Sequence, residues 1–181
     1  DDSYTETGFK HKQQIVSDFV REVAPKDAWD LGANTGAFSR ILSKQGIPTV
    51  AWDMDIGTVE DNYQEVVASQ EENLLPLLLD LTNPSPAIGW SNQERMSISE
   101  RSPVSLVLAL ALVHHLAIGN NVPLPKIAAY FASLCESLII EFVPKDDKKV
   151  KKLLSTRKDI FPTYTQAGFE AAFSAHFTLQ Q

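Results

Sequence analysis

The sequence contains one cysteine, Cys135, and no cluster of cysteines and histidines with the spacing of a zinc site. Because a single cysteine cannot form an internal disulfide, we expect Cys135 to be a small buried residue. These two deficits exclude a disulfide-stapled fold and give no reason to predict a metal centre.

Long apolar runs and positive charge are also scarce. No run of about 18 apolar residues is present, so no membrane-spanning helix is predicted, and the polar start DDSYTETG does not resemble a secretory signal peptide. The chain has 16 lysines and arginines against 23 aspartates and glutamates, a net charge of -7, which disfavours general binding to nucleic acid. We therefore predict a soluble cytoplasmic protein without a membrane partner. The sequence indicates no oligomeric state.

The length fits one globular domain. With 181 residues, 44% of them hydrophobic, the chain can bury one substantial core. We predict an N-terminal helical segment over residues 1–26 and a Rossmann-like core over residues 27–181. The segment HFTLQQ, residues 176–181, is predicted to begin a sixth strand. Because the chain lacks an initial methionine and stops there, we expect a fragment or a trimmed form of a longer protein.

Strand-like and helical patterns alternate along the chain. The strand-like runs are almost continuously apolar, which is typical of parallel strands covered by helices on both faces. This pattern predicts a Rossmann-like three-layer α/β/α sandwich with a mostly parallel sheet. The predicted strands are 28–31, 47–53, 73–81, 103–112 and 137–143, and the predicted helices are 9–24, 36–46, 56–70, 126–136, 143–155 and 165–176.

Helical spacing also predicts which side of each helix packs on the core. In helix 9–24 the apolar residues at this spacing are Ile15, Phe19, Val20 and Val23, and in helix 56–70 they are Val59, Tyr63, Val66 and Val67. In helix 143–155 we expect Val150, Leu153 and Leu154 to pack inward. Its lysines 148, 149, 151 and 152 then form a solvated face, with polyanion binding as the alternative.

The segment 82–103 interrupts the alternation, since it has three prolines and little periodicity. We expect a long connection with a short helix near residues 92–101. Connections of this length are uncommon in compact domains and are often functional, although a simple surface excursion fits equally well.

The stretch WDLGANTGAF, residues 29–38, runs from the first predicted strand, 28–31, into a glycine-containing turn. In open α/β sheets this turn is the usual place for ligand contact. Gly32 and Gly36 permit a close approach to the main chain, and Asn34 tolerates a left-handed conformation. A dinucleotide fingerprint requires glycine where this chain has Asn34 and Ala37, which weakens an NAD interpretation without removing it.

Acidic residues lie at or near the carboxyl ends of the first three predicted strands, at Asp30, Asp53 and Asp80. A carboxylate at Asp53 can accept hydrogen bonds from both hydroxyls of a ribose, and one at Asp80 can accept a bond from an adenine amino group. A carboxylate at Asp30 favours a cationic group over a phosphate. The alternatives are that Asp30 caps the turn, that Asp53 is a helix N-terminal charge, and that Asp55 takes the ribose role.

These residues resemble the motifs of class I S-adenosylmethionine-dependent methyltransferases. DLGANTGAF is similar to the first motif of that family, VAWDMD to the second, LLLDL to the third, and LVLALALVHHL to the region after the fourth strand. The run from DLTNPSPAIGW to IIEFVPKDD resembles a bacterial subgroup in which some members are called nodulation proteins. The resemblance implies S-adenosyl-L-methionine as cofactor and the following binding residues: Asp30, Gly32, Ala33, Asn34, Gly36, Asp53, Met54, Asp80 and Leu81.

The resemblance also implies methyl transfer by in-line displacement to an acceptor that the sequence does not identify. If the acceptor is a hydroxyl, the candidate general bases are His114, His115 and Glu141. Adjacent residues on a helix point about 100° apart, so both histidines are not expected to face one substrate. An NAD-dependent oxidoreductase and a non-catalytic binding module of a larger protein stay open as alternative functions.

Overall fold

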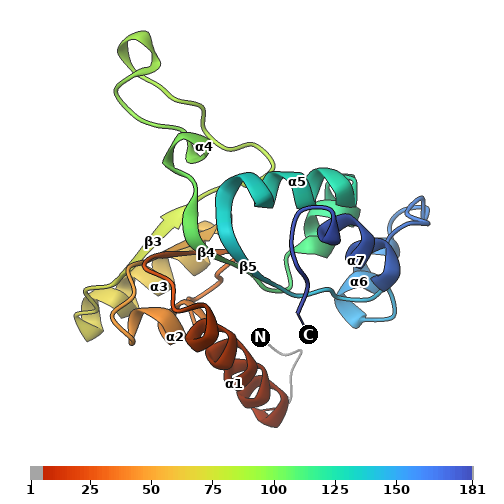
Figure 1. The fold of residues 1–181 in the computed structure, drawn as a ribbon, viewed down its shortest axis with the longest axis horizontal. Coiled ribbons are helices and arrows are strands. Elements are labelled where there is room, and N and C mark those ends of the chain that lie inside the picture. The colour runs from red at the N-terminus through yellow and green to blue at the C-terminus, as the bar shows by residue number, and fades with distance from the viewer. Residues whose placement is uncertain (1–5, 181) are drawn as a thin grey trace. The chain divides into compact units, whose positions relative to one another are not determined.

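A computed structural model describes residues 6–180, and its strands and helices follow one another in the predicted order (Figure 1). The sheet has five strands in the order β3-β2-β1-β4-β5. β1 is parallel to both β2 and β4, and β2 is parallel to β3. The strands are β1 (Ala28–Leu31), β2 (Thr49–Asp53), β3 (Leu74–Leu78), β4 (Val104–Ala109) and β5 (Cys135–Ile140). The predicted α/β fold with a mostly parallel sheet is confirmed.

The helices connect these strands. They are α1 (Glu6–Val23), α2 (Ser39–Ser43), α3 (Ile56–Ser69), α4 (Ile98–Arg101), α5 (Leu124–Leu134), α6 (Lys148–Leu154) and α7 (Gln166–Ser174), with a 3-10 turn at Trp90–Asn92 and a π-helical turn at His115–Gly119. The chain runs outward from β1 to β2 and β3 and then returns to β4 beside β1. The strand order therefore reverses between β1 and β4, where sheets of this class bind their ligands.

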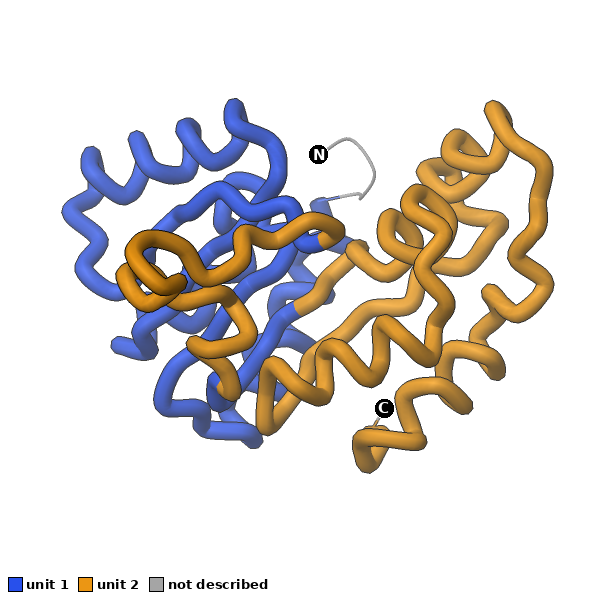
Figure 2. The backbone as a smooth tube through the Cα atoms, turned by 90° about the horizontal axis from the view of Figure 1, so that it is seen from above, with its two compact units in different colours: residues 1–81, 104–108 blue, residues 82–103, 109–181 orange. Residues whose placement is uncertain are grey.

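The chain divides into two compact units, and neither is continuous in sequence (Figure 2). Unit 1 comprises Asp1–Leu81 and Val104–Leu108, and unit 2 comprises Thr82–Pro103 and Ala109–Gln181. In unit 1, α3 packs against β2 and β3, and Val66 of α3 covers a buried cluster of Ala33, Ala51 and Leu74. In unit 2, α5 packs against β5 and α7, with Phe131 and Phe173 fully buried.

The predicted sixth strand is wrong for the residues that the structure describes. Residues 176–180 form no strand, and Gln181 lies outside the described part of the chain, as do residues 1–5 of the predicted N-terminal segment. The two apolar positions in HFTLQQ are too few to bury a sixth strand, so the local pattern alone does not form one.

The buried side of α1 differs by one position from the prediction. Val16 and Val20 are buried, whereas Ile15 is 42% exposed. Adjacent positions lie about 100° apart on a helix, so a stripe of closely spaced apolar residues does not fix which edge faces inward. The side of α1 that is buried is set by its packing against α2.

α3 shows a larger departure from the prediction. Its fully buried residue is Asn62, whereas Tyr63 and Val67 are exposed. Asn62 is three residues after Val59 and four before Val66, so it lies on the same side of the helix as those two predicted core positions. The polar side chain faces inward because it has hydrogen-bond partners there.

Segment 82–103 contains less helix than predicted. An isolated antiparallel bridge pairs Ile88 with Arg95, and the predicted helix near 92–101 is confined to α4. Ser97 and Glu100 form a capping box that starts α4. Two further predictions are confirmed, because Cys135 and Val150 are both buried.

Candidate functional site

The turn that follows β1 has the left-handed residues that its sequence predicts. Gly32, Asn34 and Gly36 have φ angles of 79°, 50° and 80°. The amides of Gly32 and Ala33 both donate to the carbonyl oxygen of Trp52 in β2, each at 2.9 Å. The turn is thus fixed to the carboxyl end of the neighbouring strand.

Asp53, the last residue of β2, connects this turn to the next one. Its carboxylate accepts a hydrogen bond from the Asn34 amide at 2.8 Å and another from the Asp55 amide at 2.9 Å. The side chain is only half-buried. A carboxylate has about four acceptor positions, so Asp53 can still accept hydrogen bonds from a ligand.

The Asp55 carboxylate caps a helix. Asp55 is the N-cap of α3, where its carboxylate accepts hydrogen bonds from the amides of Gly57 at 2.8 Å and Thr58 at 3.1 Å. The helix-terminal interpretation therefore belongs to Asp55 and not to Asp53.

Asp30 is enclosed at the end of β1, with only 2% of its surface exposed. Its carboxylate accepts a hydrogen bond of 2.6 Å from the hydroxyl of Ser39, the first residue of α2. Burial raises the pKa of Asp30 to about 6, while the Ser39 hydrogen bond opposes the rise and the charge of Asp53 adds to it. The two carboxylates are thus close enough to interact, while the charge of Lys12 opposes the rise.

Arg40 forms a network of hydrogen bonds with the turn that the sequence analysis did not predict. Arg40 of α2 donates to the Thr35 carbonyl oxygen at 2.7 Å, to Asn62 Oδ1 at 2.9 Å and to Glu71 Oε1 at 2.9 Å. The Arg40 and Glu71 side chains are only 13% and 14% exposed. Only Asn62 could have been predicted to be buried, because it lies on the same side of its helix as the apolar residues Val59 and Val66. Arg40 and Glu71 gave no signal, because charged residues on short helices and loops normally face solvent.

The other predicted binding residues of unit 1 follow β2 and β3. Met54 is 67% exposed directly after Asp53. Asp80 and Leu81 are half-buried and lie just beyond β3, which ends at Leu78 and not at Asp80 as predicted. The Leu79 amide donates to the Asp53 carbonyl oxygen at 2.8 Å, so the residues after β3 begin beside the end of β2.

The three predicted catalytic residues belong to unit 2. His114 is fully buried, and neither of its ring nitrogens has a hydrogen-bond partner among the described residues. Burial and then the charge of His115 lower the pKa of His114 to about 4, with Glu141 among the opposing charges. His115 is exposed at the start of the π-helical turn, and the Glu141 amide donates to the Ala109 carbonyl oxygen at 3.2 Å.

The expected divergence of the two histidines is not observed. Their ring centroids are 4.2 Å apart with a tilt of 38° between the ring planes. The chain leaves α-helical geometry here, and a π-helical turn with side-chain rotation can bring adjacent rings together. Of the pair, only His115 is open to solvent.

Residues 6–180 contain neither a metal-binding cluster nor a membrane-spanning helix. No group of three or more histidine, cysteine, aspartate or glutamate residues in that range is arranged to hold a metal ion. No helix in the same range has the length and apolar character that crossing a membrane requires.

Comparison with known proteins places this site in a wider context. No family model matches the chain. Nodulation protein NoeA of Rhizobium meliloti (strain 1021) is 40% identical over 173 residues, which are 95% of this chain and 36% of NoeA. The chain thus spans little more than a third of the length of this curated relative. The predicted resemblance to proteins with nodulation names is confirmed.

Among solved structures, magnesium protoporphyrin IX methyltransferase (ChlM) from Synechocystis PCC 6803, which has bound S-adenosylhomocysteine (SAH), matches with a TM-score of 0.59. The two chains are 18% identical, and the match covers 97% of this chain and 78% of ChlM. The chain has the fold of the class I methyltransferases.

Two further structures share this methyltransferase fold. YcgJ of Bacillus subtilis matches with a TM-score of 0.58 and 14% identity over 92% of this chain and 68% of YcgJ. The bifunctional kinase-methyltransferase WbdD matches with a TM-score of 0.53 and 15% identity over 80% of this chain and 30% of WbdD. The family resemblance predicted from the sequence is thus confirmed for the fold.

Proposed function

We propose that residues 1–181 form one methyltransferase domain that binds S-adenosyl-L-methionine and transfers its methyl group to an acceptor. The observation that carries this proposal is the pair of interacting carboxylates, Asp30 and Asp53, at the turn after β1. Two negative charges oppose the pyrophosphate of NAD, whereas they attract a ligand with a positive sulfur and an ammonium group. The match to ChlM, which has bound SAH, supports the same ligand class.

Each residue of this site has a role that its chemistry allows. Asp53 is half-exposed and retains acceptor capacity for the two ribose hydroxyls. Met54, Asp80 and Leu81 supply apolar surface and one acceptor for an adenine ring. The left-handed turn Gly32-Ala33-Asn34 with Gly36 permits close approach of the ligand to the main chain. Asp30 acts through its charge, because its carboxylate is enclosed and bonded to Ser39.

Bound S-adenosylmethionine supplies a methyl group that its positive sulfur has already activated. The protein then has to align the acceptor and exclude water. For a hydroxyl acceptor, we propose His115 as the proton acceptor, since it is exposed while His114 is buried with a pKa of about 4. Glu141 is the second candidate for this role.

Calorimetric titration tests the ligand. We expect SAH and S-adenosylmethionine to bind and to raise the unfolding temperature, and NAD to do neither. Asp53→Asn should weaken SAH binding by about ten- to a hundredfold, the effect of losing hydrogen bonds to a charged group. Asp55→Asn is the matched control, because asparagine also caps helices and the Asp55 carboxylate is already bonded to the amides of Gly57 and Thr58.

Three outcomes would contradict this proposal. They are binding of NAD in place of SAH, no binding of either ligand, and equal weakening of SAH binding in Asp53→Asn and Asp55→Asn. Release of SAH with a panel of hydroxyl, amine and carboxylate acceptors then tests catalysis. Tight binding without turnover on any acceptor is the result expected for a non-catalytic binding module.

A further inference from the structure

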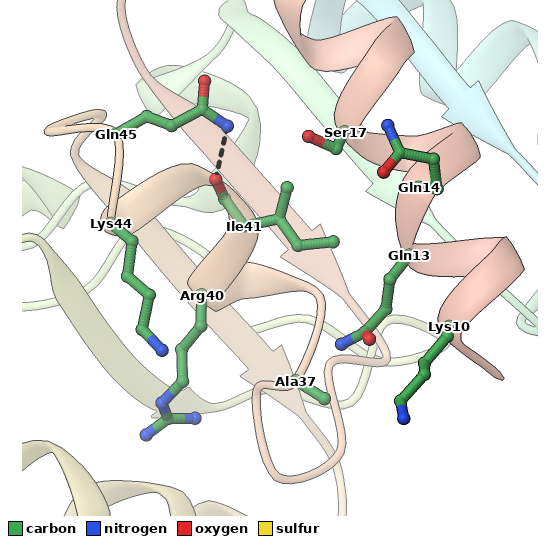
Figure 3. A pocket seen from close by; sticks show the side chains of 9 residues that line it. All are labelled: Lys10, Gln13, Gln14, Ser17, Ala37, Arg40, Ile41, Lys44 and Gln45. Atoms are coloured by element: carbon green, nitrogen blue, oxygen red, sulfur yellow. Dashed lines mark hydrogen bonds between the residues drawn. The ribbon is translucent and has the colours of Figure 1, made fainter. Parts of the chain in front are cut away.

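A hollow lies in unit 1, between α1 and the segment that contains α2 (Figure 3). Its volume is about 420 Å³, which falls within the range of small-molecule sites. Helix α1 contributes four lining residues and the other segment five. They are Lys10, Gln13, Gln14 and Ser17, and Ala37, Arg40, Ile41, Lys44 and Gln45.

The lining is positive and rich in hydrogen-bond donors. It has three basic side chains, three amides and one hydroxyl, and none of the nine residues is an aspartate or a glutamate. Glu71 balances the charge of Arg40, and the exposed Glu6 balances that of Lys10 at 2.6 Å. Lys44 also lines the hollow and has no such acidic partner among residues 6–180.

Several donors of this hollow are free to bind a ligand. Within the described residues, the side chains of Gln13, Ser17 and Lys44 form no hydrogen bond or ion pair. They come from two different helical segments and line the same space (Figure 3). An amide, a hydroxyl and an ammonium that line one hollow from two sides suit an anion whose oxygens point in several directions. A tetrahedral phosphate has this geometry, whereas a flat carboxylate offers only two oxygens.

The remaining lining indicates that the anion belongs to a small organic molecule. Ala37 and Ile41 give the hollow an apolar part beside its donors. We propose that this hollow binds the phosphate group of a small phosphate ester, with Lys44 as its main charge partner and Gln13 and Ser17 as hydrogen-bond donors. None of its lining residues is among the predicted cofactor contacts, although Ala37 belongs to the turn after β1.

Titration of the full chain with inorganic phosphate and with phenyl phosphate, at constant ionic strength, tests this site. We expect saturable binding of both, with phenyl phosphate tighter because Ala37 and Ile41 can cover its ring. Lys44→Gln should weaken both by about tenfold, the loss of one charge-assisted hydrogen bond. Lys26→Gln is the matched control, since Lys26 is an exposed lysine of unit 1 outside the hollow. Gln13→Leu gives a second variant that changes no charge and should also weaken binding.

The proposal is overturned if neither probe binds. It is also overturned if Lys44→Gln and Lys26→Gln weaken binding equally, because a nonspecific attraction that depends only on net charge would give that result. Displacement of phosphate by saturating SAH would also overturn it, because the probe would then occupy the cofactor turn. Lys44-dependent binding of short single-stranded DNA without binding of phenyl phosphate would identify a polyanion surface instead. Binding of phosphate can fail while SAH still binds, so this test is independent of the proposed methyl transfer.

Discussion

At the scale of single residues, two features of position 36 require glycine: its backbone conformation and the lack of space for a Cβ atom. Its φ angle is 80°, a conformation that side chains disfavour. A Cβ atom at this position would lie 2.6 Å from the Asn62 amide and 2.7 Å from Arg40 Nη1. Both neighbours belong to the network behind the turn, so neither can move without loss of its hydrogen bonds.

Gly36→Ala is therefore expected to destabilise the protein and to weaken SAH binding. Gly46→Ala is the control, because Gly46 has a φ angle of 79° but no atom within 4 Å of the added Cβ. The control should lower the free energy of unfolding by about 1 kcal/mol, from backbone strain alone. Gly36→Ala should lower it by about 2–4 kcal/mol, since the contact is added to the strain. Urea unfolding measures both, and equal losses would show that the contact has no cost.

At the scale of elements, Arg40 holds together parts of the chain that are distant in sequence. Its guanidinium connects the turn after β1 with α3 and with Glu71, which follows α3. The pair is largely enclosed, so each charge depends on the other. The position of the turn after β1 thus depends on the Arg40 side chain that bonds to its Thr35 carbonyl oxygen.

Arg40→Met is expected to lower the free energy of unfolding by about 3–5 kcal/mol, because Glu71 is left as an enclosed charge without its partner. Adding Glu71→Met should recover much of that loss. Lys10→Met is the control, since the Lys10–Glu6 pair is exposed and worth at most about 1 kcal/mol. Urea unfolding of the three variants measures these values. A loss in Arg40→Met no larger than in Lys10→Met would contradict the role of the network.

At the scale of the whole molecule, two buried titratable groups, Asp30 in unit 1 and His114 in unit 2, make the free energy of unfolding depend on pH in opposite directions. Asp30 has a pKa of about 6 when folded and about 3.9 when unfolded, so its protonation stabilises the fold below about pH 4. That stabilisation is lost as the pH rises through about 6. His114 has a folded pKa of about 4 and an unfolded value near 6.5, so its contribution is present above about pH 6.5 and is lost on acidification toward 4.

Single variants should separate these two effects. Asp30→Asn keeps an acceptor for Ser39 and removes the first effect, so its stability should fall on acidification from about pH 6.5 to 4.5 more steeply than that of the unmodified protein. His114→Phe should fold, because no hydrogen bond to the ring is lost among the described residues, and its stability should decrease as the pH rises over this window. Urea midpoints across this range measure both slopes. Parallel curves for the two variants would contradict the assigned pKa directions.

The sequence by itself determined the order of strands and helices and the position of the acids near the carboxyl ends of the first strands. Near-continuous apolar runs and glycine turns are local features, so β1 at 28–31 and the turn at 32–38 are predictable from neighbouring residues. The sequence also suggested Asp53 over Asp55, and the capping bonds of Asp55 agree with that choice. Whether these residues hold S-adenosylmethionine stays a prediction.

Only the tertiary structure decided which polar residues face inward. Asn62, Arg40 and Glu71 lie 9 to 31 positions apart, and their burial depends on hydrogen bonds that form when the turn, α2 and α3 meet. The close contact between the His114 and His115 rings likewise occurs at a π-helical turn that no local sequence pattern predicted. A buried polar group is stable only beside its partner, and the chain brings such partners together only by folding.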